Sequence, residues 1–218
     1  MDIFLKILFV ILSYFLGSIP FGFLIGKMKG VDLRKEGSKN IGATNAGRVL
    51  GKKYAVLTYI LDMLKGATFV FLFRFTIIPA KYCLVSPMLY GFIATIGHAF
   101  PIYLKFKGGK SVSCGCGAVC GYAPILLPIL LIVFFIIKKI SKLVSFSSLI
   151  CTIITVLIVL GITLISKDFL LQYSSDLKFW PYNYWYLIFT CLIGGIVYLK
   201  HLPNIKRIFK HEENPINY

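Results

Sequence analysis

The segment 37–48 combines residue types that could bind an anionic group. Its glycines let the backbone approach a ligand closely, and exposed amides in such a turn can surround an oxyanion. Its arginine adds a planar guanidinium that matches phosphate or carboxylate geometry. A flexible surface turn is the alternative, because Gly, Asn and Ser are common in loops. The candidate residues of this first cluster are Ser38, Asn40, Thr44, Asn45 and Arg48.

A second cluster spans 97–111 and contains a Gly-Gly-Lys turn. Such a turn at the start of a helix offers one anion backbone amides, the positive end of the helix dipole and an ammonium group. It is not a P-loop, because the first glycine of that motif is absent, so ATP is not implied. His98 is a candidate general base or anion donor, with a structural role as the alternative. The candidate residues here are His98, Lys105, Lys107, Gly108, Gly109 and Lys110.

A third cluster lies near the C-terminus and consists of His201, Asn204, Arg207 and Glu213. The first three are spaced by three positions, so they share one helix face if the preceding apolar helix continues. A solvated tail that binds lipid headgroups is the alternative.

Asp62 and Lys65 stand one helical turn apart in an apolar segment, where they can form an ion pair. Ionisable residues inside a membrane indicate a functional site by default. A buried structural pair that orients the first loop is the alternative.

The rest of the sequence indicates an all-α integral membrane protein. The chain has 218 residues, of which 58% are hydrophobic and 15% charged, with a mean hydropathy of +0.83. Soluble domains average about 45–50% apolar and about 25% charged residues. A soluble protein of this size has too little interior to bury so much apolar surface, which excludes an ordinary soluble enzyme. Several membrane spans remain as the explanation.

Charge and cysteine content narrow the partners. The formal net charge of +16 would suggest nucleic acid in a soluble protein, but in a membrane protein basic residues mark cytoplasmic loops and attract anionic lipids. We therefore expect no nucleic-acid partner. The six cysteines show neither CxxC spacing nor a disulfide pattern, so neither a metal nor a disulfide is expected.

Seven transmembrane helices are predicted, with the N-terminus outside and the C-terminus in the cytoplasm. The sidedness follows from the basic loops and tail, which the positive-inside rule places in the cytoplasm. Residues 121–124 divide one apolar stretch into two short helices, with a re-entrant hairpin as the alternative. Segment 166–182 and the aromatic residues around its end are predicted to form an outer interface. The predicted spans are 3–27, 54–79, 84–103, 113–122, 124–137, 144–165 and 183–199.

All three clusters fall on the cytoplasmic side of this topology. Together they predict a basic, hydrogen-bonding pocket at the membrane surface, suited to a phosphate-bearing substrate beside an acyl chain. No nucleophilic triad or carboxylate pair stands out, so we expect catalysis by positioning and charge stabilisation.

Four segments, 17–22, 37–48, 97–110 and 201–207, resemble the PlsY-type acyl-phosphate:glycerol-3-phosphate acyltransferases. The resemblance covers essentially the whole chain and implies one membrane-embedded domain, 1–218, in a bacterial cytoplasmic (inner) membrane. It implies transfer of a fatty acyl group from acyl phosphate to the sn-1 hydroxyl of glycerol 3-phosphate, giving lysophosphatidate and phosphate. The implied partners are these two substrates and membrane lipids, with no cofactor, metal or acyl-CoA.

The resemblance and the charges suggest a role for each candidate residue. Ser38, His98, Lys110 and Asn204 are assigned to catalysis, and the remaining members of the three clusters to substrate binding. We expect Lys107, Lys110 and the glycine amides to hold acyl phosphate, and Asn45, Arg48 and Arg207 to hold glycerol 3-phosphate. The base is His98 or the phosphate of the donor. The sequence departs from the family pattern at Lys39, Ser111, Ser113, Cys114 and His211.

Two alternatives belong to other functional classes. A transporter of a phosphorylated metabolite or anion would need polar groups deep in the membrane and open to both sides. A non-catalytic subunit that binds headgroups would tolerate neutral substitutions in the three clusters.

Overall fold

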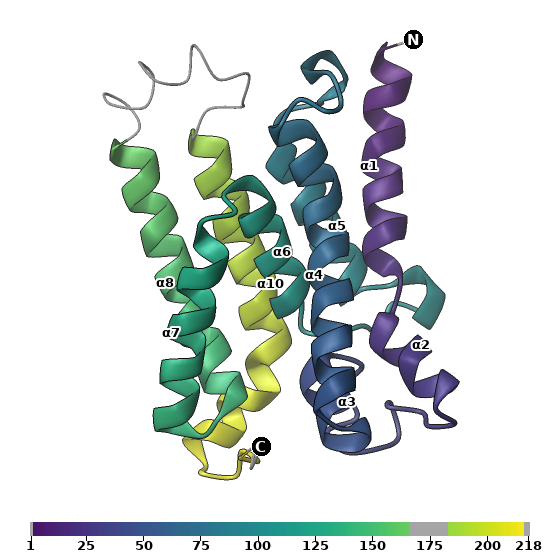
Figure 1. Cartoon of the computed structure of the whole chain (residues 1–218), viewed down its shortest axis with the longest axis vertical. Coiled ribbons are helices and arrows are strands. Elements are labelled where there is room, and N and C mark those ends of the chain that lie inside the picture. The colour runs from purple at the N-terminus through teal and green to yellow at the C-terminus, as the bar shows by residue number, and fades with distance from the viewer. Residues whose placement is uncertain (1, 166–182, 216–218) are drawn as a thin grey trace.

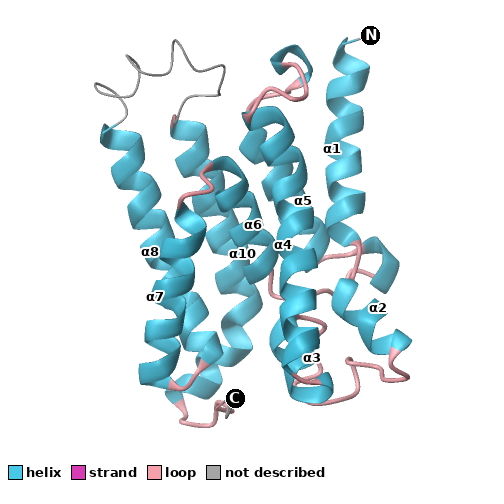
Figure 2. Ribbon diagram, viewed as in Figure 1, coloured by secondary structure: helices cyan, strands magenta, loops and turns pink. Residues whose placement is uncertain are grey.

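The computed structural model describes residues 2–165 and 183–215, and every regular element in this part of the chain is a helix (Figures 1 and 2). The helices are α1 (Asp2–Ser18), α2 (Phe21–Met28), α3 (Ala43–Leu50), α4 (Lys52–Arg74), α5 (Pro87–Ala99), α6 (Val112–Tyr122), α7 (Leu126–Ser141), α8 (Val144–Ile165) and α10 (Tyr184–Phe209). Two short 3₁₀ turns, η1 (Ala80–Tyr82) and η2 (Ile102–Leu104), lie before and after α5.

Four stretches of the described chain are long and apolar enough to cross a membrane. They are α4, Pro87–Leu104, α8 and α10, and a fifth span results if α1 and α2 count as one. The predicted segment 166–182 at the outer interface lies outside the described residues.

The prediction of a single helix over 3–27 is wrong, because the chain bends by 40° between α1 and α2. The bend falls at Ile19 and Pro20. Proline has no backbone N–H and disfavours helical geometry at the residue before it, so the helix ends there and a new one begins.

Three other predictions about elements have clear outcomes. The two short helices are confirmed as α6 and α7, with the break at residues 123–125. The last helix continues to Phe209, so His201, Asn204 and Arg207 do share one helical face. The loop predicted between the first two spans contains a further short helix, α3, which carries Asn45 and Arg48.

Small residues allow the helices around the site to pack very closely. α4 packs most extensively on α6, and a Cβ atom at Gly66 or Gly117 would overlap backbone of the facing helix. Gly17 and Gly97 make the same kind of approach between α1 and α5. Close approach through small residues is a common basis of helix association in membranes, where lipid removes the hydrophobic drive.

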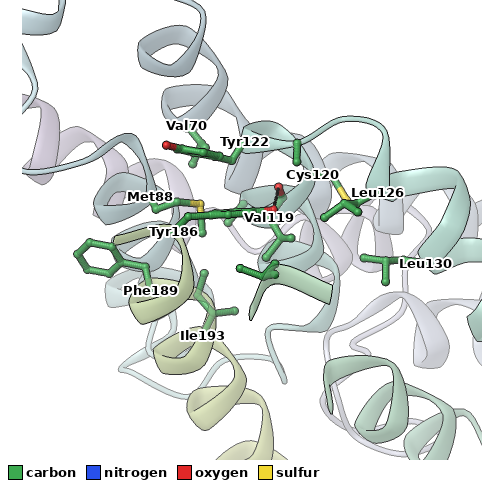
Figure 3. Packing of buried hydrophobic residues seen from close by; sticks show 13 residues of the cluster. Val70, Met88, Val119, Cys120, Tyr122, Leu126, Leu130, Tyr186, Phe189 and Ile193 are labelled. Carbon is green, nitrogen blue, oxygen red and sulfur yellow. Dashed lines mark hydrogen bonds between the residues drawn. The ribbon is translucent and has the colours of Figure 1, made fainter. Parts of the chain in front are cut away.

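Aromatic residues form the core at the C-terminal end of α6, where Tyr122 is the last residue of the helix. The rings of Tyr122 and Tyr186 stack with centroids 4.5 Å apart, and the Tyr186 hydroxyl donates to the Val119 carbonyl at 3.2 Å (Figure 3). A tyrosine hydroxyl can stay buried because it has this partner. The contact fixes α10 against α6.

We predict that Gly117→Ala lowers the thermal stability of the protein in detergent, because its Cβ would overlap the Met63 backbone. Overpacking of this kind costs about 1–3 kcal/mol. Gly161→Ala in α8 is the matched control, since nothing lies within 4 Å of its Cβ position. Equal melting temperatures for the two variants would contradict the packing described for α4 and α6.

Candidate active site

One cavity of about 740 Å³ brings the three sequence clusters together. Its walls come from the 37–42 segment, α3, α4, α5, the loop before α6, α6, α7, α8, α10 and the C-terminal tail. Its polar end includes Arg48 of α3 and the tail residues Glu213 and Asn214. Eleven predicted site residues line it: Ser38, Asn40, Thr44, Asn45, Arg48, His98, Lys110, His201, Asn204, Arg207 and Glu213.

Four predicted site residues do not line this cavity. Lys105 and Lys107 are exposed on the loop before α6. Gly108 and Gly109 pack against His98 instead, and the Gly109 amide already donates to the His98 carbonyl oxygen at 3.1 Å. A Cβ atom at either glycine would overlap His98. The glycines are thus required for close packing in this structure, and their predicted contact with a phosphate stays a prediction.

Asn45 uses its whole amide within the protein. Its Nδ2 donates to the carbonyls of Leu33 and Glu36, each at 3.0 Å, and its Oδ1 accepts from the Ser38 amide at 2.7 Å. Asn45 is 1% exposed, so these bonds replace those that water would make. The side chain therefore shapes the loop that brings Ser38 to the cavity, a role that spacing alone did not predict.

Glu213 joins the tail to two helices. Its carboxylate accepts from Asn204 Nδ2 at 2.6 Å, Arg207 Nε at 2.7 Å and Ser145 Oγ at 2.8 Å. Burial raises the pKa of this carboxyl, but these three donors outweigh burial and hold the pKa below its ordinary value. Arg48 Nη2 donates to the carbonyl of the next residue, Asn214, at 3.0 Å. The tail thus closes across the polar end from α3 to α8 and α10.

Ser145 was missed by sequence reasoning. It is a serine in an apolar helix, where a back-bond to the preceding turn is the ordinary expectation, and 68 residues separate it from Glu213. No local pattern could have linked the two.

Lys110 supplies a half-buried cation to the cavity wall. Burial lowers the pKa of its ammonium to about 8; the Glu213 carboxylate opposes this shift, and the Arg207 and Arg48 guanidiniums add to it. The preceding residue, Ser111, has a left-handed φ of 64° and its hydroxyl donates to the Thr95 carbonyl at 3.2 Å. This bond anchors the start of α6 to α5 beside the cavity.

The predicted ion pair within α4 is confirmed. Asp62 Oδ1 lies 2.8 Å from Lys65 Nζ, and both side chains are almost fully buried. His98 Nδ1 lies 3.5 Å from the same oxygen, a contact that the sequence did not predict. Both Asp62 and His98 line the cavity.

The cavity changes character along its length. Its polar end presents Arg48, Lys110 and Arg207, whereas its other end is lined by side chains such as Leu130, Phe134 and Ile193. Leu130 and Ile193 also belong to the hydrophobic core around Tyr122 and Tyr186 (Figure 3). Such a cavity suits a molecule with an anionic head and an apolar tail. In the described part of the chain, no group of three or more His, Cys, Asp or Glu side chains could hold a metal ion.

The family follows from comparison with known proteins, because residues 7–211 match the family model described as glycerol-3-phosphate acyltransferase. The chain belongs to this acyltransferase family. It is 39% identical to the glycerol-3-phosphate acyltransferase of Streptococcus mutans, over 97% of this chain and 94% of the relative. It is 38% identical to that of Bacillus velezensis, over 97% of each.

Solved structures agree with this assignment. The chain is similar to PlsY, an integral membrane glycerol 3-phosphate acyltransferase, in its glycerol 3-phosphate form, with a TM-score of 0.81, 32% identity and coverage of 97% and 96%. Its lysophosphatidic acid form gives a TM-score of 0.79 at 31% identity, covering 97% and 95%. The resemblance inferred from the sequence is confirmed, and the acyltransferase is an integral membrane protein of a bacterial family.

We predict that Ser145→Ala lowers the catalytic efficiency of acyl transfer to labelled glycerol 3-phosphate. The substitution removes one of three donors to a partly buried carboxylate, and such a bond is worth about 1.5–3 kcal/mol, which sets an upper limit near a hundredfold; we expect about three- to tenfold. Ser147→Ala is the control, because the Ser147 hydroxyl donates to the Leu143 carbonyl within its own helix region. Equal losses in both variants would disprove the role of Ser145.

The Lys110 ammonium predicts an alkaline limit to activity. Below pH 8 the group is charged and can attract an anionic substrate, and above pH 8 it becomes neutral, so kcat/KM should fall as the pH rises through about 8. In Lys110→Arg the fall near pH 8 should vanish, because a guanidinium stays protonated. A wild-type profile that is flat to pH 9.5, or an unchanged fall in the arginine variant, would contradict this assignment.

Proposed function

We propose that this acyltransferase moves a fatty acyl group from acyl phosphate to the sn-1 hydroxyl of glycerol 3-phosphate, giving lysophosphatidate and inorganic phosphate. The observation that supports this proposal most directly is the cavity, which has Arg48, Lys110 and Arg207 at one end and apolar walls at the other; Lys39, Lys52 and Lys138 also line it. An acyl phosphate has the matching shape, with a phosphate head and an alkyl tail.

The charges of the two substrates explain why several cations are needed. Two unit negative charges 4 Å apart repel by about 4 kcal/mol at an effective dielectric constant of about 20. Lys110, Arg48 and Arg207 supply positive charge from three different elements, so that both phosphates can be held at once. Glu213 keeps Arg207 in place through the 2.7 Å bond to its Nε.

The reaction then needs orientation more than a covalent enzyme intermediate. The sn-1 oxygen attacks the acyl carbonyl carbon, the bond from that carbon to the phosphate oxygen breaks, and phosphate leaves with the electron pair. The hydroxyl proton passes to a phosphate oxygen of the donor or to His98. Ser38 and Asn204 orient the hydroxyl or the carbonyl. Holding two reactants in such a geometry replaces much of the entropic barrier of a bimolecular step.

The proposal includes a topology. Seven crossings, with the N-terminus outside and the C-terminus in the cytoplasm, would place the polar end of the cavity at the cytoplasmic face of the bacterial inner membrane. The basic residues at that end support this orientation through the positive-inside rule.

We predict that the purified enzyme in detergent forms lysophosphatidate from palmitoyl phosphate and labelled glycerol 3-phosphate, but not from palmitoyl-CoA. The Lys110→Ala variant, with folding verified by its melting temperature, should lose the activity because the cavity loses a cation. Equal rates with palmitoyl-CoA would disprove the donor. No product from either donor by a folded protein would favour transport, which a flux assay in liposomes would then test.

A further inference from the structure

We propose that Asp62 is a positioning residue for acyl transfer: it orients His98, which holds the Gly108–Gly109 turn and so places Lys110 at the cavity wall. This inference rests on the proposed function of the cavity. It gives a role in the reaction to a buried carboxylate that the mechanism above does not use.

The ion pair within α4 does not by itself explain where the Asp62 carboxylate lies. A purely structural ion pair would need only the contact between Lys65 Nζ and Asp62 Oδ1, which are 2.8 Å apart. The same oxygen also faces His98 Nδ1 at 3.5 Å, from a different helix, and both Asp62 and His98 reach the cavity wall. The carboxylate therefore stands between a fixed cation and the one cavity-lining histidine of the second cluster.

Lys65 fixes the carboxylate in space. Its ammonium donates to the Ile19 carbonyl at 2.7 Å, where the chain bends between α1 and α2, and it lies 5.6 Å from the centre of the Phe21 ring. The pair is thereby tied to a second element, so Asp62 cannot follow His98 if the histidine moves. His98 Nδ1 makes no hydrogen bond within the described residues, so at 3.5 Å the fixed carboxylate orients the imidazole by attracting an N–H on this nitrogen.

The opposite edge of the His98 ring meets the glycine turn. A Cβ atom at Gly109 would overlap His98 Nε2, and the Gly109 amide donates to the His98 carbonyl at 3.1 Å. Lys200 Nζ, from α10, donates to the carbonyl of Ala99, the next residue, at 3.0 Å. The ring therefore lies between the Asp62 carboxylate and the glycine turn, and any rotation of the ring would push on the turn.

Lys110 follows this turn directly in the chain. A displacement of Gly109 would move the backbone from which the Lys110 side chain reaches the cavity, and small misplacements of a group that stabilises charge in the transition state reduce the rate strongly. The position of the ammonium thus depends on α4 through the contact between Asp62 and His98. The expected effect of losing Asp62 is on kcat, with folding retained.

The test must separate this role from that of a structural ion pair. Asp62→Asn alone would leave the Lys65 ammonium buried without its carboxylate, which is strongly destabilising. The double variant Asp62→Asn/Lys65→Met removes both charges and keeps the approximate side-chain volumes. The Ile19 carbonyl still accepts from the Phe21 amide at 3.2 Å, so no acceptor is stranded.

We expect the double variant to melt close to the wild type, but to lose at least tenfold in kcat with palmitoyl phosphate and labelled glycerol 3-phosphate. In a His98→Gln background, the same two substitutions should lower kcat by less than twofold, because their effect passes through the histidine. Thr58→Val, one helical turn before Asp62 on α4 and next to Gly22 of α2, is the control and should keep the wild-type kcat.

Each outcome decides one point. Wild-type kcat in a folded double variant would overturn the proposal, as would an equal loss with and without His98. If the double variant does not fold, Asp62→Glu keeps the charge but shifts the carboxylate; it should fold with a reduced kcat, and wild-type kcat would overturn the proposal. A wild-type enzyme that makes no product would instead disprove the function proposed for the cavity.

Discussion

The polar end of the cavity depends on the hydrogen bonds that the Glu213 carboxylate accepts from Ser145, Asn204 and Arg207. Arg48, Lys110 and Arg207 lie close together there, and without a nearby anion their mutual repulsion would favour their separation. Glu213 accepts a hydrogen bond from Arg207, and its negative charge opposes the lowering of the Lys110 pKa. The next residue, Asn214, offers the carbonyl to which Arg48 donates. One carboxylate thus keeps cations from three elements close together and leaves them with net positive charge for a substrate.

The membrane environment explains how the helices support this arrangement. Lipid offers little hydrophobic drive for helix association, so close packing must supply it. At Gly66 and Gly117 the backbones of α4 and α6 approach so closely that no side chain fits between them. This approach brings the start of α6, with Lys110 just before it, against the helix that carries Asp62. At the C-terminal end of α6, the rings of Tyr122 and Tyr186 stack in the hydrophobic core that also contains the cavity-lining residues Leu130 and Ile193.

The site therefore has two levels of charge. Near the polar end, partly exposed cations surround Glu213, while deeper in the bundle Asp62 and Lys65 compensate one another almost completely out of solvent. The outer group is suited to binding anions, since its net charge is positive. The inner pair is neutral overall and is suited to fixing positions, because a buried pair is rigid when both members have further partners.

The sequence by itself determined the helical class, the family and the three clusters. The short helices α6 and α7 followed from a Gly-Tyr-Ala-Pro break, and the shared face of His201, Asn204 and Arg207 followed from their spacing. These features depend on neighbours within a few residues, which a local pattern records. The bend at Pro20 and the helix α3 were missed, although both arise locally, because an apolar run hid the first and a polar composition hid the second.

Only the tertiary structure decided how the site residues are used. It joined Ser145 to Glu213, placed His98 between Asp62 and Gly109, turned Asn45 toward the backbone of its own loop, and left Lys105 and Lys107 outside the cavity. Each of these outcomes depends on which helices pack together or on how a loop folds back. The physical reason is that spacing fixes which face of a helix a side chain occupies, whereas its partner is fixed by the packing of segments distant in the chain.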